Sequence, residues 1–202
     1  MKAVLFVVEP DVLLLDEPLS ALDAQVRANL REEIRRLQLA LGTTTLFVTH
    51  DQEEAMAISD RVGVMNRGKL EQIADPDTLY NNPATTFVAG FVGTMNRVVT
   101  QISNGKVSLF GQQISAKTGG ITSGDVVALI RPEKVSVKTN STETNATVVT
   151  RSFLGASSQL TCRTTDGLLI QALMGSHESE ALHPGTPVRI NVTSSEVLVS
   201  HV

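Results

Sequence analysis

The sequence predicts two consecutive units, an α/β unit over residues 1–91 and an all-β unit over residues 92–202. In the first unit, strand-like apolar runs alternate with a helical pattern. In the second, short β-rich runs are separated by turns rich in Gly, Asn and Asp, which indicates a small barrel or sandwich. Asn104-Gly105 and Asp166-Gly167 predict hairpins between such runs. The net charge also changes near residue 92, from −6 before it to +2 after it. We therefore expect two domains of different architecture.

The first informative element is the apolar run Val12–Leu15, which has no polar alternation and indicates a short, fully buried strand. Asp16 and Glu17 follow it directly, and Pro18 restricts the backbone of Glu17. In open α/β sheets, ligands bind at the C-terminal ends of the strands. One carboxylate there can hold Mg²⁺ through its water shell while the other polarises a nucleophilic water. Two solvated acids at a strand end are an equally open interpretation of this segment alone.

A helix and a second strand follow. The helix is predicted from apolar residues at helical spacing, and Gly42 supplies its C-terminal stop. Thr44–Thr49 is a β-rich run that ends at His50. A right-handed parallel crossover brings His50 to the same sheet edge as Asp16 and Glu17. The residues that define the apolar face of the helix are Val26, Leu30, Ile34, Leu37 and Leu41.

These motifs resemble those of the ATP-binding subunits of ABC transporters. Val12–Pro18 resembles their Walker B strand, Ser20–Asp23 their D-loop, and Val48–Ala55 the segment that carries the switch histidine. Ser59–Lys69 resembles the strand and turn that come next in the family. Pro83–Phe91 resembles the last helix before the accessory domain of importers for maltose, polyamines, iron or glycerol phosphate. The resemblance extends over essentially the whole chain from residue 9 onward.

The resemblance assigns roles that spacing alone does not show. It implies that Asp16 holds Mg²⁺ through water, that Glu17 is the general base for the attacking water, and that His50 contacts the γ-phosphate. ATP and Mg²⁺ are therefore the cofactors implied for a complete subunit. The D-loop is implied to touch a second copy of the chain through Ser20, Ala21, Leu22 and Asp23.

The sequence departs from the family because it contains no phosphate-binding loop. Such a loop runs from a strand into a helix, so that backbone N–H groups cradle the phosphates. Gly63–Lys69 matches only the glycine and lysine spacing, is followed by Leu70 instead of Ser or Thr, and is typical of two strands around a turn. Ser108–Gln113 is a similarly misplaced match to the signature sequence. We therefore expect the C-terminal part of such a subunit, truncated before the Walker B strand.

The expected truncation has consequences for ATP hydrolysis and for the first residues of the chain. Without the phosphate loop we expect neither ATP hydrolysis nor bound nucleotide from the 202 residues alone. The apolar run Ala3–Val8 is far too short to span a bilayer and is expected to be the remainder of a helix before Val12–Asp16.

The all-β unit has a resemblance of its own. Ile130–Val135, with Phe153–Gly155 and Pro184-Gly185, resembles the TOBE domain of these importers, a tandem OB-like β unit. The fold expected for the whole chain is thus a partial P-loop NTPase α/β domain followed by an all-β OB-like TOBE domain. The family uses the TOBE domain for subunit contacts and, in some members, for regulation. For Arg131 and Glu133, two interpretations remain open: a surface ion pair, or a regulatory contact with a ligand or partner.

Two functions remain. The first is the energy-coupling ATPase subunit of an importer, which works with a second copy and with transmembrane permease subunits at the inner face of the membrane. The second is a non-catalytic dimerisation or regulatory module. Nucleic acid is not an expected partner, since aromatic residues make up 3% of the chain, Trp is absent and the net charge is −4. The single Cys162 cannot form an internal disulfide, which favours the cytoplasm.

Overall fold

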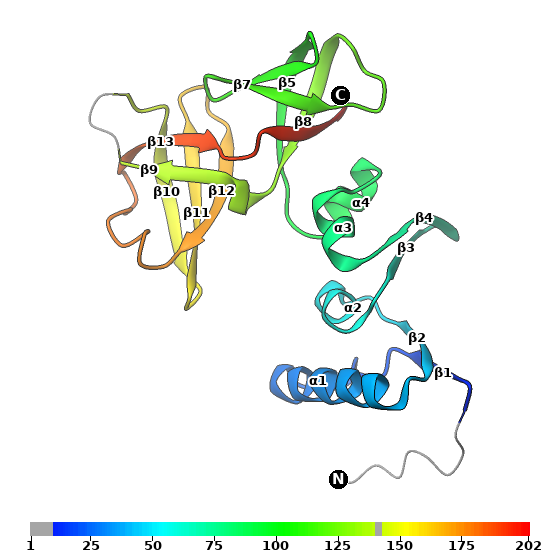
Figure 1. Cartoon of the computed structure of the whole chain (residues 1–202). Helices are drawn as coiled ribbons and strands as arrows, with labels where there is room; N and C mark the ends of the chain where they lie inside the picture. Colours follow the sequence, from blue (N-terminus) through cyan, green and yellow to red (C-terminus); the bar gives the residue numbers. More distant parts are fainter. Residues whose placement is uncertain (1–9, 140–142) are drawn as a thin grey trace. The chain divides into compact units, whose positions relative to one another are not determined.

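The structure, a computed structural model, describes residues 10–139 and 143–202. Two compact units follow one another along the chain, the first ending at Val88 and the second beginning at Ala89 (Figure 1). The predicted helix remainder at residues 3–8 lies outside the described residues. Within the described ranges, every helix is too short or too polar to cross a lipid bilayer.

In the first unit, two parallel strands are joined by a helix. β1 (Val12–Asp16) and β2 (Thr44–Val48) pair in parallel, and α1 (Ala24–Leu41) lies between them in the chain (Figure 1). Asp23 begins α1 by accepting a hydrogen bond from the Val26 N–H at 2.9 Å. Gly42 ends it in the left-handed conformation, with φ 64°. The strand–helix–strand prediction is confirmed, and these two caps explain where the helix begins and ends.

A hairpin occupies the segment that matches the phosphate-loop spacing. β3 (Val62–Asn66) and β4 (Lys69–Ala74) are antiparallel, and they are joined by Arg67 and Gly68 with φ of 47° and 79°. Two positive φ angles in succession are the signature of a tight two-residue hairpin turn. Gly63–Lys69 is therefore a strand–turn–strand segment, as predicted, and does not form a phosphate loop. The other helices up to residue 91 are α2 (Gln52–Ile58), α3 (Pro76–Asn81) and α4 (Thr86–Phe91).

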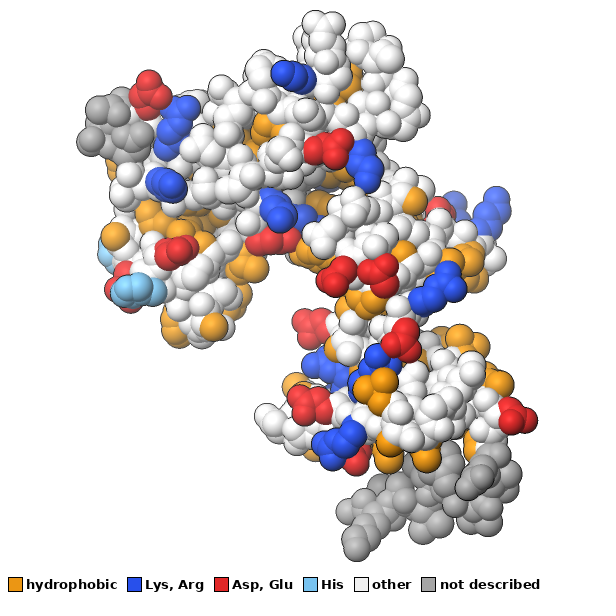
Figure 2. Space-filling view, in the orientation of Figure 1, with side chains coloured by type: hydrophobic (Ala, Val, Ile, Leu, Met, Phe, Trp, Pro, Cys, Tyr) orange, Lys and Arg blue, Asp and Glu red, His pale blue; other side chains and the backbone are white. Residues whose placement is uncertain are grey.

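The prediction of a fully buried first strand is wrong. Val12 is 53% exposed and Leu14 is 69% exposed, whereas Leu13 and Leu15 are half-buried. β2 alternates in the same way, with Leu46 exposed. The physical reason is that the β1–β2 sheet has two strands only, so one of its faces has no packing layer among the described residues. Apolar side chains accordingly reach the surface of this unit beside its charged residues (Figure 2).

The second unit contains a closed five-stranded barrel in the order β14-β7-β6-β5-β8. Asn104 and Gly105, with φ of 51° and 70°, form the predicted hairpin between β5 and β6. Ser108–Gln113 spans the β6–β7 hairpin, so it is not the helical signature segment of the family. The barrel strands are β5 (Asn96–Ser103), β6 (Lys106–Leu109), β7 (Gln112–Lys117), β8 (Gly124–Ile130) and β14 (Glu196–His201).

A five-stranded sheet in the order β12-β11-β10-β13-β9 completes this unit. Asp166 and Gly167 lie between β11 and β12, where a hairpin was predicted. Barrel and sheet share one apolar core, in which Val107, Leu160 and Ile190 are fully buried. The sheet strands are β9 (Val135–Lys138), β10 (Ala146–Phe153), β11 (Ser157–Thr164), β12 (Leu169–Gly175) and β13 (Pro187–Val192), with a 3₁₀ turn, η1 (Pro132–Lys134), before β9.

Side-chain amides hold the barrel and the sheet together. Asn96 in β5 donates to the Gln171 carbonyl at 2.8 Å and accepts from the Gln171 N–H at 2.7 Å. Gln112 in β7 makes the same pair of bonds to the backbone of Val192 in β13, at 3.3 and 2.7 Å. Each side-chain amide thus makes the two hydrogen bonds that a neighbouring strand would make. The backbone N–H and carbonyl that it contacts would otherwise be unpaired next to the core.

Candidate functional site

The candidate site lies at the ends of the two parallel strands. Asp16 ends β1 opposite Val48 of β2, and its side chain is exposed. The Glu17 N–H donates to the Val48 carbonyl at 2.8 Å, so the pairing continues one residue past the strand. Glu17 has φ 44°, a conformation that costs energy for a residue with a side chain.

His50 lies beside Glu17, although 33 positions separate them in the sequence. Its Nδ1 is 3.0 Å from Oε1 of Glu17, and the side chains are 74% and 46% exposed respectively. An ionised carboxylate only accepts hydrogen bonds, so Nδ1–H is the donor whenever Glu17 is ionised. The imidazole then presents Nε2 as a second polar atom. The pair can therefore orient a water molecule or take up its proton at a solvent-accessible edge.

The segment Ser20–Asp23 forms a tight turn directly after this pair. Ser20 donates to the Glu17 carbonyl from both its N–H, at 3.3 Å, and its hydroxyl, at 3.0 Å. Leu19 is 2% exposed and anchors the turn, and the Leu22 N–H donates to the Leu19 carbonyl at 3.2 Å. Ala21 lies within this turn, and Asp23 caps α1. These hydrogen bonds therefore link the Glu17 carbonyl, the turn and the beginning of α1.

The structure also contains an ion-pair network that was not predicted from the sequence. Arg27 in α1 contacts Oδ2 of Asp51 at 3.1 Å and Oε1 of Glu54 at 3.6 Å. Its other terminal nitrogen donates to the Leu22 carbonyl at 3.1 Å. We call Arg27, Leu22, Thr49, Asp51 and Glu54 the Arg27 network. The sequence signals were one Arg among four in the same helix and acids after His50, and neither indicates a pairing across 24 residues.

Arg131 and Glu133 lie in the second unit, at the beginning of η1 and within it. Arg131 is 7% exposed and donates to the Thr94 carbonyl at 3.4 Å. Arg131 is therefore buried and not a surface residue; it lies directly after β8, at the beginning of η1. Glu133, in η1, is half-buried and lines a cavity of about 540 Å³.

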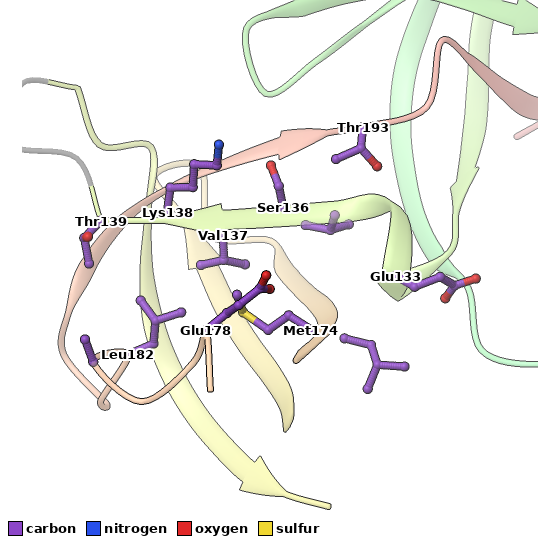
Figure 3. A pocket seen from close by; sticks show the side chains of 12 residues that line it. Glu133, Ser136, Val137, Lys138, Thr139, Met174, Glu178, Leu182 and Thr193 are labelled. Carbon is purple, nitrogen blue, oxygen red and sulfur yellow. The ribbon is translucent and has the colours of Figure 1, made fainter. Parts of the chain in front are cut away.

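This cavity has a mixed lining (Figure 3). Val137 points from β9 toward Met174 and Glu178, whereas Ser136 and Lys138 point to the other side of the same strand (Figure 3). A cavity of a few hundred Å³ with apolar walls and a few polar groups can hold a small ligand.

Comparison with known proteins identifies the class. Residues 128–199 match the TOBE domain family. The sulfate/thiosulfate import ATP-binding protein of Caulobacter vibrioides is 42% identical over 160 residues, which cover 79% of this chain and 46% of that protein. The Fe(3+) ions import ATP-binding protein of Fusobacterium nucleatum is 36% identical over 199 residues, covering 96% of this chain and 53% of that protein. The chain thus spans about half the length of these relatives.

Among solved structures, the cytoplasmic molybdate-binding protein ModG matches 52% of this chain and 96% of its own, with a TM-score of 0.43 and 16% identity. That likeness is too distant to say anything about a ligand.

The all-β unit and its matched family make this a TOBE-domain protein. Together with the two importer relatives, this places the chain in the family of ABC importer ATP-binding subunits, so the resemblance drawn from its motifs is confirmed.

Proposed function

We propose that this chain supplies the carboxylate-and-histidine part of the ATP-hydrolysing site in the energy-coupling subunit of an ABC importer. The observation that carries the proposal is the 3.0 Å contact between Glu17 and His50 at the ends of two parallel strands. The names of the relatives support it, since both are import ATP-binding proteins. In this proposal β1 is the Walker B strand of a P-loop NTPase domain.

The residues present fit the cofactors that the family implies. Mg²⁺ is commonly held through one or two carboxylates, with water and phosphate oxygens as the other ligands, and Asp16 is an exposed carboxylate in such a position. Mg²⁺–ATP supplies the reactive γ-phosphate when bound. Glu17 orients a water molecule and accepts its proton, and His50 holds the Glu17 carboxylate in place through Nδ1.

The same proposal assigns partners and location. Ser20–Asp23 forms an exposed turn with buried Leu19 as its anchor, a suitable surface for contact with a second copy of the chain. The permease subunits of an importer are the membrane partners, and the protein works in the cytoplasm at the inner face of the membrane. Because the 202 residues contain no phosphate loop, we expect no hydrolysis and no tight Mg²⁺–ATP binding from them alone.

A non-catalytic regulatory module is the second candidate, and one observation favours it. The second unit has its own apolar core and a cavity lined by Glu133, Val137 and Met174. A small ligand in that cavity would touch η1, β9 and β12 together. Calorimetric titration of the chain with the solutes of candidate importers would detect such binding.

The test of hydrolysis restores a phosphate loop. The chain is fused to the N-terminal part of the Caulobacter vibrioides relative, and ATP turnover is compared between the fusion and its Glu17→Gln variant. We expect turnover that Glu17→Gln lowers at least about hundredfold, the usual contribution of a general base, while nucleotide affinity changes less than about twofold. The matched control is Glu33→Gln on the exposed side of α1. Equal turnover by the fusion and its Glu17→Gln variant would overturn the proposal.

A further inference from the structure

One guanidinium connects the turn after Glu17 with the segment that carries His50. Arg27 uses three of its atoms for three different partners: one terminal nitrogen for Asp51 at 3.1 Å, the other for the Leu22 carbonyl at 3.1 Å, and Nε for Glu54 at 3.6 Å. The Arg27 side chain is 32% exposed, so this network lies partly below the surface. Leu22 belongs to the Ser20–Asp23 turn, whereas Asp51 and Glu54 follow His50.

Glu54 shows why a cation is needed at this place. Its side chain is only 3% exposed, and a buried carboxylate is costly unless it is paired and hydrogen-bonded. One of its oxygens accepts from the Thr49 hydroxyl at 2.7 Å, and the other faces Nε of Arg27. The buried acid therefore fixes both the residue before His50 and the position of the guanidinium.

The two neighbours of His50 in the chain are held by the same network. The Asp51 N–H donates to the Thr49 hydroxyl oxygen at 3.0 Å. The Asp51 carboxylate caps α2 by accepting from the N–H groups of Glu53 and Glu54 at 2.9 and 3.2 Å, and its other oxygen meets Arg27. The backbone on either side of His50 is thus fixed, while the imidazole itself stays 74% exposed and contacts Glu17.

We propose that Arg27 is a positioning residue that sets the Ser20–Asp23 turn against the His50 segment, so that the Glu17–His50 hydrogen bond forms. This inference builds on the hydrolytic role proposed above and names a further residue of the same site. The two terminal nitrogens donate to Asp51 and to the Leu22 carbonyl in different directions, while the positive charge at Nε faces Glu54. Arg provides this planar fork, and the single ammonium of Lys does not. Arg27 acts through Leu22, Asp51 and Glu54, and does not itself contact Glu17 or His50.

The test is a spectroscopic one on the 202-residue chain without nucleotide. The solvent-exchange rate of the His50 Nδ1–H and the backbone amide shifts of residues 20–23 are measured by NMR in the wild type, Arg27→Lys and Arg27→Gln. The matched control is Arg36→Gln, which removes an exposed Arg of the same helix that pairs only locally with Glu33. Thermal unfolding is recorded for each chain.

We expect Arg27→Gln to accelerate His50 Nδ1–H exchange about tenfold, the effect of losing one charge-assisted hydrogen bond, and to shift the amides of residues 20–23. Arg27→Lys keeps a charge for Glu54, so it should unfold near the wild-type temperature and still show the fast exchange. Control-like exchange in Arg27→Lys would overturn the proposal even if Arg27→Gln fails to fold, since Arg27 would then act only through its charge. Because no nucleotide is present, a failed turnover assay with normal NMR coupling would count against the hydrolytic role and leave the positioning role standing.

Discussion

Asn96 offers the sharpest test of how the all-β unit is held together. Asn96 is 6% exposed, and its side-chain amide bonds to the backbone of β12 as a paired strand would. It donates to the Gln171 carbonyl and accepts from the Gln171 N–H. Substitution by Ala leaves two backbone groups next to the core without a partner. At about 1–2 kcal/mol for each such group, Asn96→Ala should lower the free energy of unfolding by about 2–4 kcal/mol.

The assay is thermal unfolding of the chain followed by circular dichroism at a wavelength dominated by β structure. For a unit of this size, a loss of about 2–4 kcal/mol corresponds to a fall of roughly 8–16 °C in the midpoint of the β transition. Asn96→Asp separates the two bonds, because a carboxylate can accept from the Gln171 N–H but opposes the Gln171 carbonyl. We expect its midpoint to recover partly at acidic pH, where a protonated acid can donate.

The control is Gln101→Ala on the same strand, whose amide contacts Asp125 at an exposed position and whose loss should cost less than about 0.5 kcal/mol. If Asn96→Ala destabilised the unit no more than Gln101→Ala, the amide would not be a joint between barrel and sheet, and this account of the fold would be refuted.

Two further predictions concern single side chains. Burial raises the pKa of the Cys162 thiol to about 11, so at pH 8 its thiolate fraction is about hundredfold lower than that of an unperturbed thiol, and iodoacetamide should label it only in denaturant. The protonated Cys162 thiol contributes fully to the free energy of unfolding below pH 9, and this contribution falls as the pH rises toward 11. Rapid labelling of the native chain would contradict the raised pKa. The Thr78 N–H lowers the pKa of the Asp75 carboxyl that caps α3, so this cap stabilises at neutral pH and is lost as the pH falls through the folded value. A carbon-13 titration of Asp75 should show that lowered value, and Asp75→Asn should keep the cap without the pH dependence.

Features that depend on neighbouring residues could be predicted from the sequence. The helix from residue 24 to 41 is set by its capping residue Asp23 and by Gly42, and both act within one turn of the helix ends. The hairpins at Asn104-Gly105 and Asp166-Gly167 follow from the local ability of these residues to adopt tight turns. The approach of His50 to Glu17 could also be predicted, since a crossover between parallel strands leaves little choice of geometry.

Features that depend on distant partners could not be predicted. Val12 and Leu14 look like core residues, but burial depends on a packing layer that the composition of the strand does not reveal. Arg131 looks like a surface charge next to Glu133, but it is buried and donates to the carbonyl of Thr94, 37 positions away in the sequence. In the Arg27 network, Arg27 pairs with Asp51 and Glu54, which lie 24 or more positions away, and single contacts of this kind leave no periodic trace in the sequence.

The most direct measurement of the central claim is a double-mutant cycle on Glu17 and His50 in the fusion with a restored phosphate loop. ATP turnover and ATP affinity are measured for Glu17→Gln, His50→Ala and the double variant. If the two residues act as one unit through their 3.0 Å contact, the double variant should turn over ATP as fast as the less active of the two single variants. The affinity for ATP should be nearly unchanged. Losses that multiply would show that Glu17 and His50 act independently, and would contradict the account.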